Sequence, residues 1–198
     1  MRWCNILMAG TLALGGCGGC GDDSLPERET RKERSAEEWA KDLTSSDSDK
    51  RVTAAMALGV MGEHGKPGVP ALSQAVLHDD NWVVRYWAAY SLGHVDPDGR
   101  EVVQPLTAAL RDADWRVRSK AAEMLGKLGP VSLPAVDLLI DRLSDRQAEV
   151  RLHAATALGN IGPEAERALK YLRAVRDDDS NPAVRLGADE AIKLLERR

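Results

Sequence analysis

Three stretches of the sequence decide the fold: VRYWAAYSLG (84–93), VRSKAAEMLG (117–126) and VRLHAATALG (150–159). Each begins with Val-Arg, continues with two alanines and ends on Leu-Gly. A further copy begins at Val184-Arg185, and an earlier, weaker copy contains Arg51. The arginines of these five copies are separated by 34, 33, 33 and 34 residues. A fixed period of this length indicates a solenoid built from short repeats.

Each copy predicts an α-helix, because its apolar residues lie one residue before the arginine and three, seven and ten residues after it. A second apolar stripe follows in each repeat and predicts a partner helix, at residues 71–77, 106–110, 136–143 and 168–175. A capping box at Ser35-Ala36-Glu37-Glu38 predicts one more helix at the start. One capping helix, four helix pairs and a final helix make ten. The predicted fold class is therefore all-α, an α-solenoid of about five helix-pair repeats.

Glycine recurs inside the first helix of four repeats, although an interior glycine costs about 1 kcal/mol relative to alanine. We expect a neighbouring helix to approach these positions too closely for a Cβ atom. Three further glycines follow the helices and suit helix C-caps. The interior glycines are Gly59, Gly93, Gly126 and Gly159, and the capping glycines are Gly62, Gly129 and Gly162.

An aspartate lies six residues before four of the arginines, and Ser45 takes its place in the first repeat. Because Asp and Arg recur with the same period, we expect each Asp to reach backbone amides or the Arg of an adjacent repeat. Recurrence in every unit favours a structural role over catalysis. The predicted ladder residues are Asp79, Arg85, Asp112, Arg118, Asp145, Arg151, Asp179 and Arg185. Two residues after the Asp position come expected N-caps, Asp47, Asn81, Asp114, Gln147 and Asn181.

These residues resemble the HEAT-repeat family, in particular the short repeats named after phycobilisome lyases (PBS-lyase HEAT-like repeats). The three quoted stretches match the family's VRxxAAxALG core, and the Asp and Arg ladders match its inter-repeat residues. The resemblance covers residues 35–198, about four-fifths of the chain. It implies the armadillo-like helical fold, whereas the family serves many functions.

The first 34 residues predict an export signal and a tether. An uncharged apolar run at 6–14 is too short to span a bilayer and is typical of a signal peptide. The following Leu14-Gly15-Gly16-Cys17 resembles the lipobox of bacterial lipoproteins, whose cysteine receives the lipid. We therefore expect a lipoprotein signal peptide at 1–16, with lipidated Cys17 and a flexible tether at 17–34. An ordinary secretory signal, cleaved near Gly16, is the alternative.

Lipidation predicts a location in the cell envelope, on a membrane and facing the periplasm or the exterior. By resemblance to lipoprotein sorting in some bacteria, Gly18 after the cysteine favours the outer membrane. All three cysteines lie before residue 21, so the repeat body has no disulfide and no thiolate metal site.

Composition and motifs disfavour several classes of function. The net charge of −4 disfavours a nucleic-acid partner. The four histidines lie in different repeats without ligand spacing, and neither a nucleophile elbow nor a phosphate-binding loop is present. We therefore expect no catalytic, metal or cofactor site.

The favoured function is a lipid-anchored, non-catalytic scaffold that binds a protein of the cell envelope. The alternative is a chromophore lyase or isomerase subunit, since some relatives of these repeats have that role, and a HEAT-like DNA glycosylase is a more distant possibility. Both alternatives act in the cytosol, and an export signal disfavours them.

The resemblance also places a binding face. In HEAT-like arrays the VRxxAAxALG helix lines the concave side, with positions two, five and nine after the arginine exposed. Trp87 and Tyr90 occupy two of them in a chain with only 4% aromatic residues, and are the expected anchors. Trp87 could instead fold back over small alanines of a neighbouring helix, and Trp82 and Trp115 are expected to pack against inter-repeat turns. The predicted partner-binding residues are Trp87, Tyr90, His94, Lys120, Glu123, Lys127 and His153.

Overall fold

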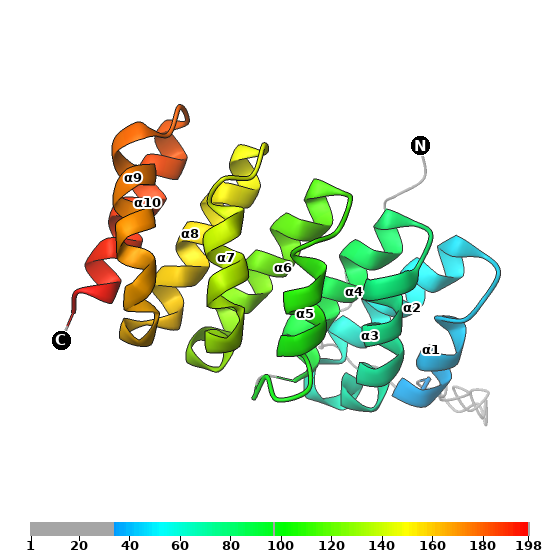
Figure 1. Cartoon of the computed structure of the whole chain (residues 1–198). Coiled ribbons are helices and arrows are strands. Elements are labelled where there is room, and N and C mark those ends of the chain that lie inside the picture. The colour runs from blue at the N-terminus through cyan, green and yellow to red at the C-terminus, as the bar shows by residue number, and fades with distance from the viewer. Residues whose placement is uncertain (1–33, 97, 198) are drawn as a thin grey trace, which may run out of the picture. The chain divides into compact units, whose positions relative to one another are not determined.

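The computed structural model describes residues 34–96 and 98–197. Within these residues the chain forms ten α-helices and three short 3-10 helices, as the repeat pattern predicts for the α-helices (Figure 1). The predicted signal peptide and Cys17 lie outside the described residues. The tether was expected to include Arg34, but this residue belongs to the repeat body, because its guanidinium lies 3.8 Å from the ring centre of Trp39 and pairs with Asp42 at 2.8 Å.

The helices form two layers, in which a long and a short helix alternate along the chain. The long helices are α2 (Ser48–Val60), α4 (Trp82–Val95), α6 (Trp115–Leu128), α8 (Ala148–Ile161) and α10 (Pro182–Leu195). The short helices are α1 (Ala36–Asp42), α3 (Val69–His78), α5 (Val103–Ala109), α7 (Val136–Arg142) and α9 (Leu169–Asp178). The 3-10 helices η1 (Gly62–Gly68), η2 (Gly129–Ala135) and η3 (Pro163–Ala168) connect three of the pairs.

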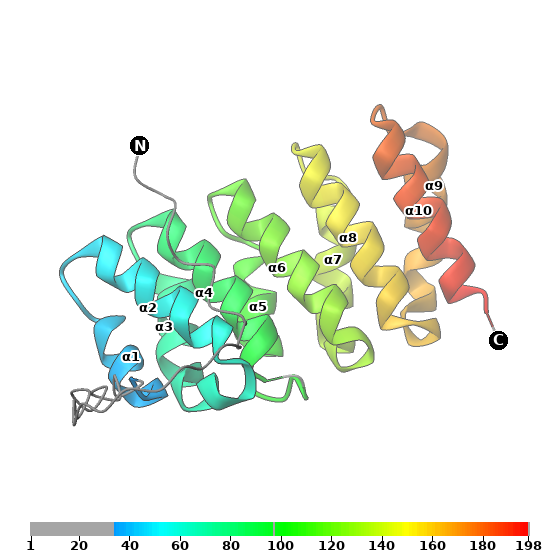
Figure 2. The same cartoon turned by 180° about the vertical axis from the view of Figure 1, so that it is seen from behind.

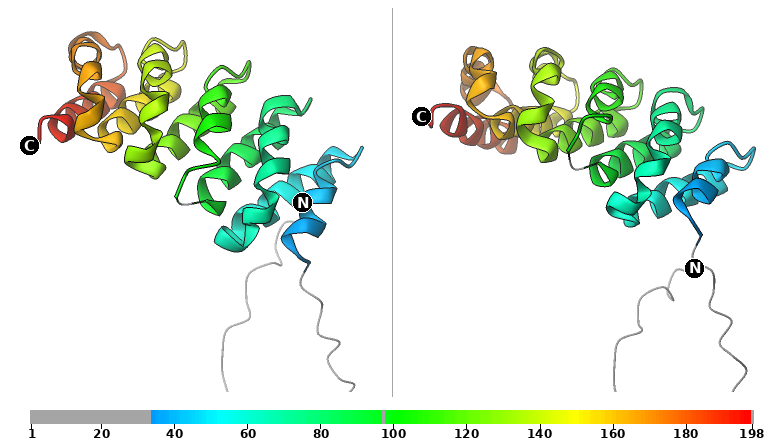
Figure 3. Two further views of the ribbon diagram at one scale, coloured as in Figure 1. Left: turned by 60° about the horizontal axis from the view of Figure 1, so that its bottom comes forward. Right: turned by 90° about the horizontal axis from the view of Figure 1, so that it is seen from below.

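Neighbouring long helices pack against one another along the array, while the short helices are more widely spaced (Figures 2 and 3). The interior glycines explain the close packing. A Cβ atom on Gly159 would lie 2.8 Å from the Cα atom of Ala191, and one on Gly126 would lie 3.0 Å from that of Ala157. The expectation that a neighbouring helix excludes the Cβ atom is confirmed.

The Asp–Arg ladder joins each repeat to the next one. Arg118 donates two hydrogen bonds to Asp145 of the following repeat, at 2.8 and 3.0 Å, and a third to the carbonyl of Asp112 in its own repeat. The Asp145 carboxylate also accepts the amide of Gln147. One arginine therefore connects two successive turns. The same geometry recurs in three other pairs, Arg51–Asp79, Arg85–Asp112 and Arg151–Asp179.

The two ends of the ladder differ from its middle. Ser45, at the first Asp position, accepts the amide of Asp47, and no ladder arginine within residues 34–96 and 98–197 bonds to its hydroxyl. Arg185 keeps the bond to the carbonyl of Asp179 in its own repeat, and in the same described residues it bonds to no further ladder aspartate. Four of the five expected N-cap side chains accept a helix amide. The side chain of Gln147 makes no capping bond.

The second repeat departs from the others in its turn. Where the other repeats have a glycine with positive φ followed by a 3-10 helix, this repeat has Asp96. The Asp96 carboxylate is fully buried and pairs with Lys66 at 2.8 Å. Burial opposes its ionisation, but Lys66 and the amide of Glu101 lower its pKa below the ordinary value.

Candidate partner-binding face

The predicted partner-binding residues all lie on the long-helix layer. Trp87, Tyr90 and His94 are on α4, next to α6, which carries the two lysines and Glu123 of the predicted set. His153 is on α8. Most of these side chains are half-buried rather than fully exposed, and Lys127 is exposed. The structure thus brings the seven residues onto one face of three consecutive long helices.

Four rings of α4 form a continuous aromatic cluster. Tyr86 meets Trp87 edge to face with ring centres 5.5 Å apart, and Trp87 meets Tyr90 in the same way at 5.4 Å. The ring of His94 stacks on Tyr90 at 4.2 Å, and its Nδ1 lies 2.8 Å from the carbonyl of Tyr90. One side of this cluster packs against the hydrophobic core, so Trp87 combines core packing with a surface position.

A charged row on α6 lies beside the aromatic cluster. The ammonium of Lys120 lies 5.2 Å from the ring centre of Tyr86 and 5.6 Å from that of Tyr90, within cation–π range. Lys120 also donates to Glu123, and Lys127 lies 3.5 Å from the same carboxylate. Burial disfavours the charged forms, but these contacts raise the pKa of Lys120 and lower that of Glu123. Both groups are therefore ionised at neutral pH.

Two hollows flank this charged row. The first, called here the aromatic pocket, has a volume of about 280 Å³ and lies between α4 and α6. The second, the polar hollow, has a volume of about 410 Å³ and lies between α6 and α8. The aromatic pocket is lined by Trp82, Val83, Tyr86, Trp87, Arg116, Ser119, Lys120, Glu123 and Glu149. The polar hollow is lined by Ala122, Glu123, Gly126, Lys127, Leu152, His153, Thr156, Ala157 and Asn160.

The aromatic pocket contains residues that the sequence did not single out for binding. Trp82, which was expected to pack against an inter-repeat turn, lines the pocket, and the guanidinium of Arg116 lies 3.5 Å from its ring centre. Arg116 is held there by two hydrogen bonds to Asp114, at 2.9 and 2.6 Å. The fixed period could have indicated Ser119, which takes the place of Tyr86 in the next repeat. Nothing in the sequence places Arg116 over Trp82.

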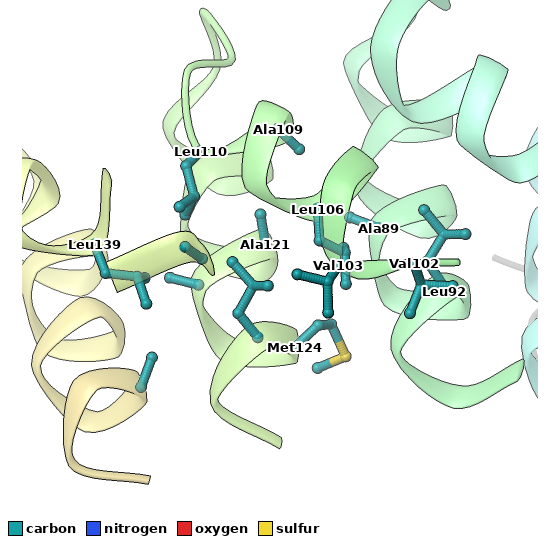
Figure 4. Close-up of a cluster of buried hydrophobic side chains, with 14 of the residues drawn as sticks. Ala89, Leu92, Val102, Val103, Leu106, Ala109, Leu110, Ala121, Met124 and Leu139 are labelled. Carbon is teal, nitrogen blue, oxygen red and sulfur yellow. The ribbon is translucent and has the colours of Figure 1, made fainter. Parts of the chain in front are cut away.

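The α4–α6 seam differs from the other long-helix seams in the residue that faces its interior glycine. In three of the four long-helix seams, the residue opposite the interior glycine is small: Ser91, Ala157 or Ala191. Opposite Gly93 it is Met124, whose side chain is fully buried. Figure 4 shows Met124 among the core side chains of this seam. The larger side chain keeps α4 and α6 in less extensive contact than the other neighbouring long helices.

A larger groove lies on the opposite layer at the same seam. It has a volume of about 900 Å³ and runs between α5 and the η2–α7 segment, with Val103, Val131 and Leu138 on its apolar wall. The short helices α5 and α7 meet mainly through η2, which leaves the groove open.

In residues 34–96 and 98–197, no three His, Cys, Asp or Glu side chains are placed to share a metal ion. Among the helices of that same part of the chain, none combines the length and the apolar character needed to cross a membrane.

The fold and its repeated inter-helix contacts define an α-solenoid repeat protein. The family description of HEAT repeats matches residues 36–108, 69–135 and 103–193. The chain therefore belongs to the HEAT-repeat family. A comparison with curated proteins finds no match.

Several solved structures share the fold. The complex of CpcE and CpcF of phycocyanin lyase from Nostoc sp. PCC7120 aligns with a TM-score of 0.69 and 24% identity, over 90% of this chain and 71% of that one. Computationally designed armadillo repeat proteins for modular peptide recognition align at 0.61 and 19%, over 80% and 81%. Human deoxyhypusine hydroxylase in complex with glycerol aligns at 0.54 and 20%, over 82% and 74%. At these identities the likeness concerns the fold alone.

Proposed function

We propose that this chain is a non-catalytic, lipid-anchored HEAT-repeat scaffold of the cell envelope. Its partner protein binds the long-helix face of α4, α6 and α8. The observation that carries the proposal is the aromatic cluster of Tyr86, Trp87, Tyr90 and His94, which borders a hollow on that face.

The composition of the face supports a binding role. Trp, Tyr and Arg are the residues most enriched at binding hot spots, and Trp87, Tyr90 and Arg116 lie together here in a chain with 4% aromatics. Arg116 is held by its contact with the Trp82 ring and its ion pair with Asp114, and Trp87 by edge-to-face contacts with Tyr86 and Tyr90, so little conformational entropy is lost when a partner docks. The structural likeness to designed armadillo proteins for modular peptide recognition adds to this support.

The interaction face is tested by site-directed photo-crosslinking in native membranes. A photoreactive amino acid replaces Lys127, whose side chain is 49% exposed on the long-helix face, or Asp137, which is 80% exposed on α7. We expect one stoichiometric protein adduct from position 127 and none from position 137. Equal adducts from both positions would contradict a dedicated face.

The anchoring role of Trp87 is tested by Trp87→Ala. We expect this change to weaken partner capture by about 2 kcal/mol or more, while the melting temperature stays within a few degrees. A large loss of thermal stability with unchanged capture would assign Trp87 to the core alone.

The membrane anchor is tested by metabolic labelling with a palmitate analogue. We expect the wild-type protein to be labelled and Cys17→Ser to abolish the label. A variant that stays labelled would refute lipidation at Cys17.

The second candidate, a chromophore lyase or isomerase subunit, is favoured by the likeness to the CpcE–CpcF complex. The two functions differ in their ligand. Binding of a bilin by the purified chain at moderate salt would favour the second candidate and contradict the scaffold. Binding of duplex DNA under the same conditions would contradict both.

A further inference from the structure

Three of the four charged side chains that line the aromatic pocket form ion pairs. Arg116 is neutralised by Asp114 at 2.6 Å, and Lys120 by its bond to Glu123. The remaining charged group of the pocket is Glu149, in the first turn of α8. Within residues 34–96 and 98–197 this carboxylate has no cationic partner. Of the charged side chains that line the pocket, Glu149 is thus the one without an ion pair in these residues.

Glu149 is exposed to solvent, and its carboxylate lies within hydrogen-bonding distance of one side chain of α6. Ser119, whose side chain is almost completely buried, lies with its hydroxyl 3.5 Å from Oε1 of Glu149 and 2.8 Å from Nδ1 of His153. A hydroxyl has one hydrogen and two lone pairs, so Ser119 can donate to the carboxylate when Nδ1 of His153 carries a hydrogen and donates to Ser119. Ser119 thus links Glu149 and His153 of α8 to α6.

The walls of the pocket select the shape of an occupant. Tyr86 and Trp87 supply aromatic surface, and a volume of about 280 Å³ suits one long side chain rather than a folded element. An acidic occupant finds both pocket cations already paired. An aliphatic stem that ends in a cation packs on the rings and places its charge at the carboxylate.

We propose that the aromatic pocket receives a lysine or arginine side chain of the partner, with its stem on Tyr86 and Trp87 and its cation paired with Glu149. This inference rests on the proposed function and names the chemistry of its partner. The partner segment is therefore basic where it crosses the seam between α4 and α6.

A displayed library of random peptides, selected on the purified full chain, tests the assignment. We expect enrichment of Lys and Arg among the captured peptides. For a selected peptide, Glu149→Gln should weaken binding about tenfold, as expected for a charge-assisted hydrogen bond of about 1.4 kcal/mol. The matched control Glu164→Gln, an exposed carboxylate on η3, should leave binding unchanged.

A double-mutant cycle isolates the contact. Replacement of the peptide's basic residue by Met should weaken binding to the wild-type chain about tenfold and have little effect on the Glu149→Gln variant. One contrary result is a set of selected peptides that lack basic enrichment and that lose binding to the Trp87→Ala variant while binding the Glu149→Gln variant normally. That result would overturn the cation assignment and leave the binding face intact. Captured peptides that are insensitive to Trp87→Ala as well would count against the proposed function itself.

Discussion

The ladder arginine makes two kinds of hydrogen bond that a lysine could not combine. Its guanidinium donates a pair of bonds to the carboxylate of the next repeat and a further bond to a carbonyl of its own turn. For Arg118 and Asp145 only 14% and 4% of the side chains are exposed. Removal of one partner leaves the other charge buried and unmatched, which costs more than the pair itself contributes.

Asp145→Asn tests this asymmetry. We expect a loss of about 2 to 3 kcal/mol in the free energy of unfolding, measured by urea titration, because Arg118 loses its counter-charge. The control is Asp137→Asn, which breaks the exposed pair with Arg167 and should cost about 0.5 kcal/mol or less. Equal losses from both variants would mean that burial does not decide the value of these pairs.

The ladder also predicts sensitivity to acid. Burial opposes ionisation of Asp79 and Asp145, but their arginines and a backbone amide hold the pKa of each below its ordinary value of 3.8. The bond from Arg151 lowers the pKa of Asp179. Carboxyl groups whose pKa is lowered in the folded state stabilise the protein fully above their unfolded-state pKa. This stabilisation is lost as the pH falls below the unfolded-state pKa and through the folded-state pKa.

We therefore expect the urea midpoint to be steady from pH 7 to about pH 5 and to fall steeply below about pH 4. The Asp145→Asn variant, which has lost one of these groups, should show a shallower fall. A midpoint that stays constant down to about pH 3 would show that the ladder carboxyl groups titrate alike in the folded and unfolded chain.

At the scale of the helix, the interior glycines trade intrinsic helix stability for close packing. Each one faces a residue of the next long helix, which is small in three seams and is Met124 in the α4–α6 seam. Small residues allow contact near backbone distance. A binding pocket and an outer groove both lie at the α4–α6 seam.

Gly159→Ala tests the packing role. Alanine improves helix propensity by about 1 kcal/mol, but its Cβ atom would lie 2.8 Å from the Cα atom of Ala191, and backbone must move. We expect a net loss of about 1 to 3 kcal/mol in chemical denaturation. Thr156→Ala, at an exposed site of the same helix, should change stability by about 0.5 kcal/mol or less. A stabilised Gly159→Ala variant would show that α8 and α10 are not held at this distance.

At the scale of the repeat body, stability is shared between neighbouring units. The central long helices α4, α6 and α8 each pack against a long helix on both sides, while α10 has such a neighbour on one side within the described residues. In an array whose contacts are local, the ends open with lower free energy than the middle.

Hydrogen exchange followed by mass spectrometry should reveal this gradient. We expect the slowest exchange in the buried turns of α6 and α8 and faster exchange in α1 and α10, because the terminal helices lose fewer contacts on opening. Uniform protection from α1 to α10 would indicate that the body unfolds only as one unit.

The helices, their order, the Asp–Arg ladder and the close approach at glycine all follow from the sequence alone. Each depends on a pattern that one repeat contains and the others copy, so a regular period translates directly into regular stacking. The position of Trp87 and Tyr90 on the long-helix face follows from the same period. Deviations from the pattern, such as Gln147 without a capping bond, concern single side chains.

Only the tertiary structure decided the form of the candidate site. Trp82 and Arg116 meet across two helices, and Glu149 lines the pocket from a third, with its carboxylate 3.5 Å from the Ser119 hydroxyl. The ion pairs of Arg116 and Lys120 lie within one repeat, whereas the contact of Glu149 with Ser119 joins two repeats. Contacts between repeats depend on which side chains of separate helices face one another, and spacing along the chain does not carry that information.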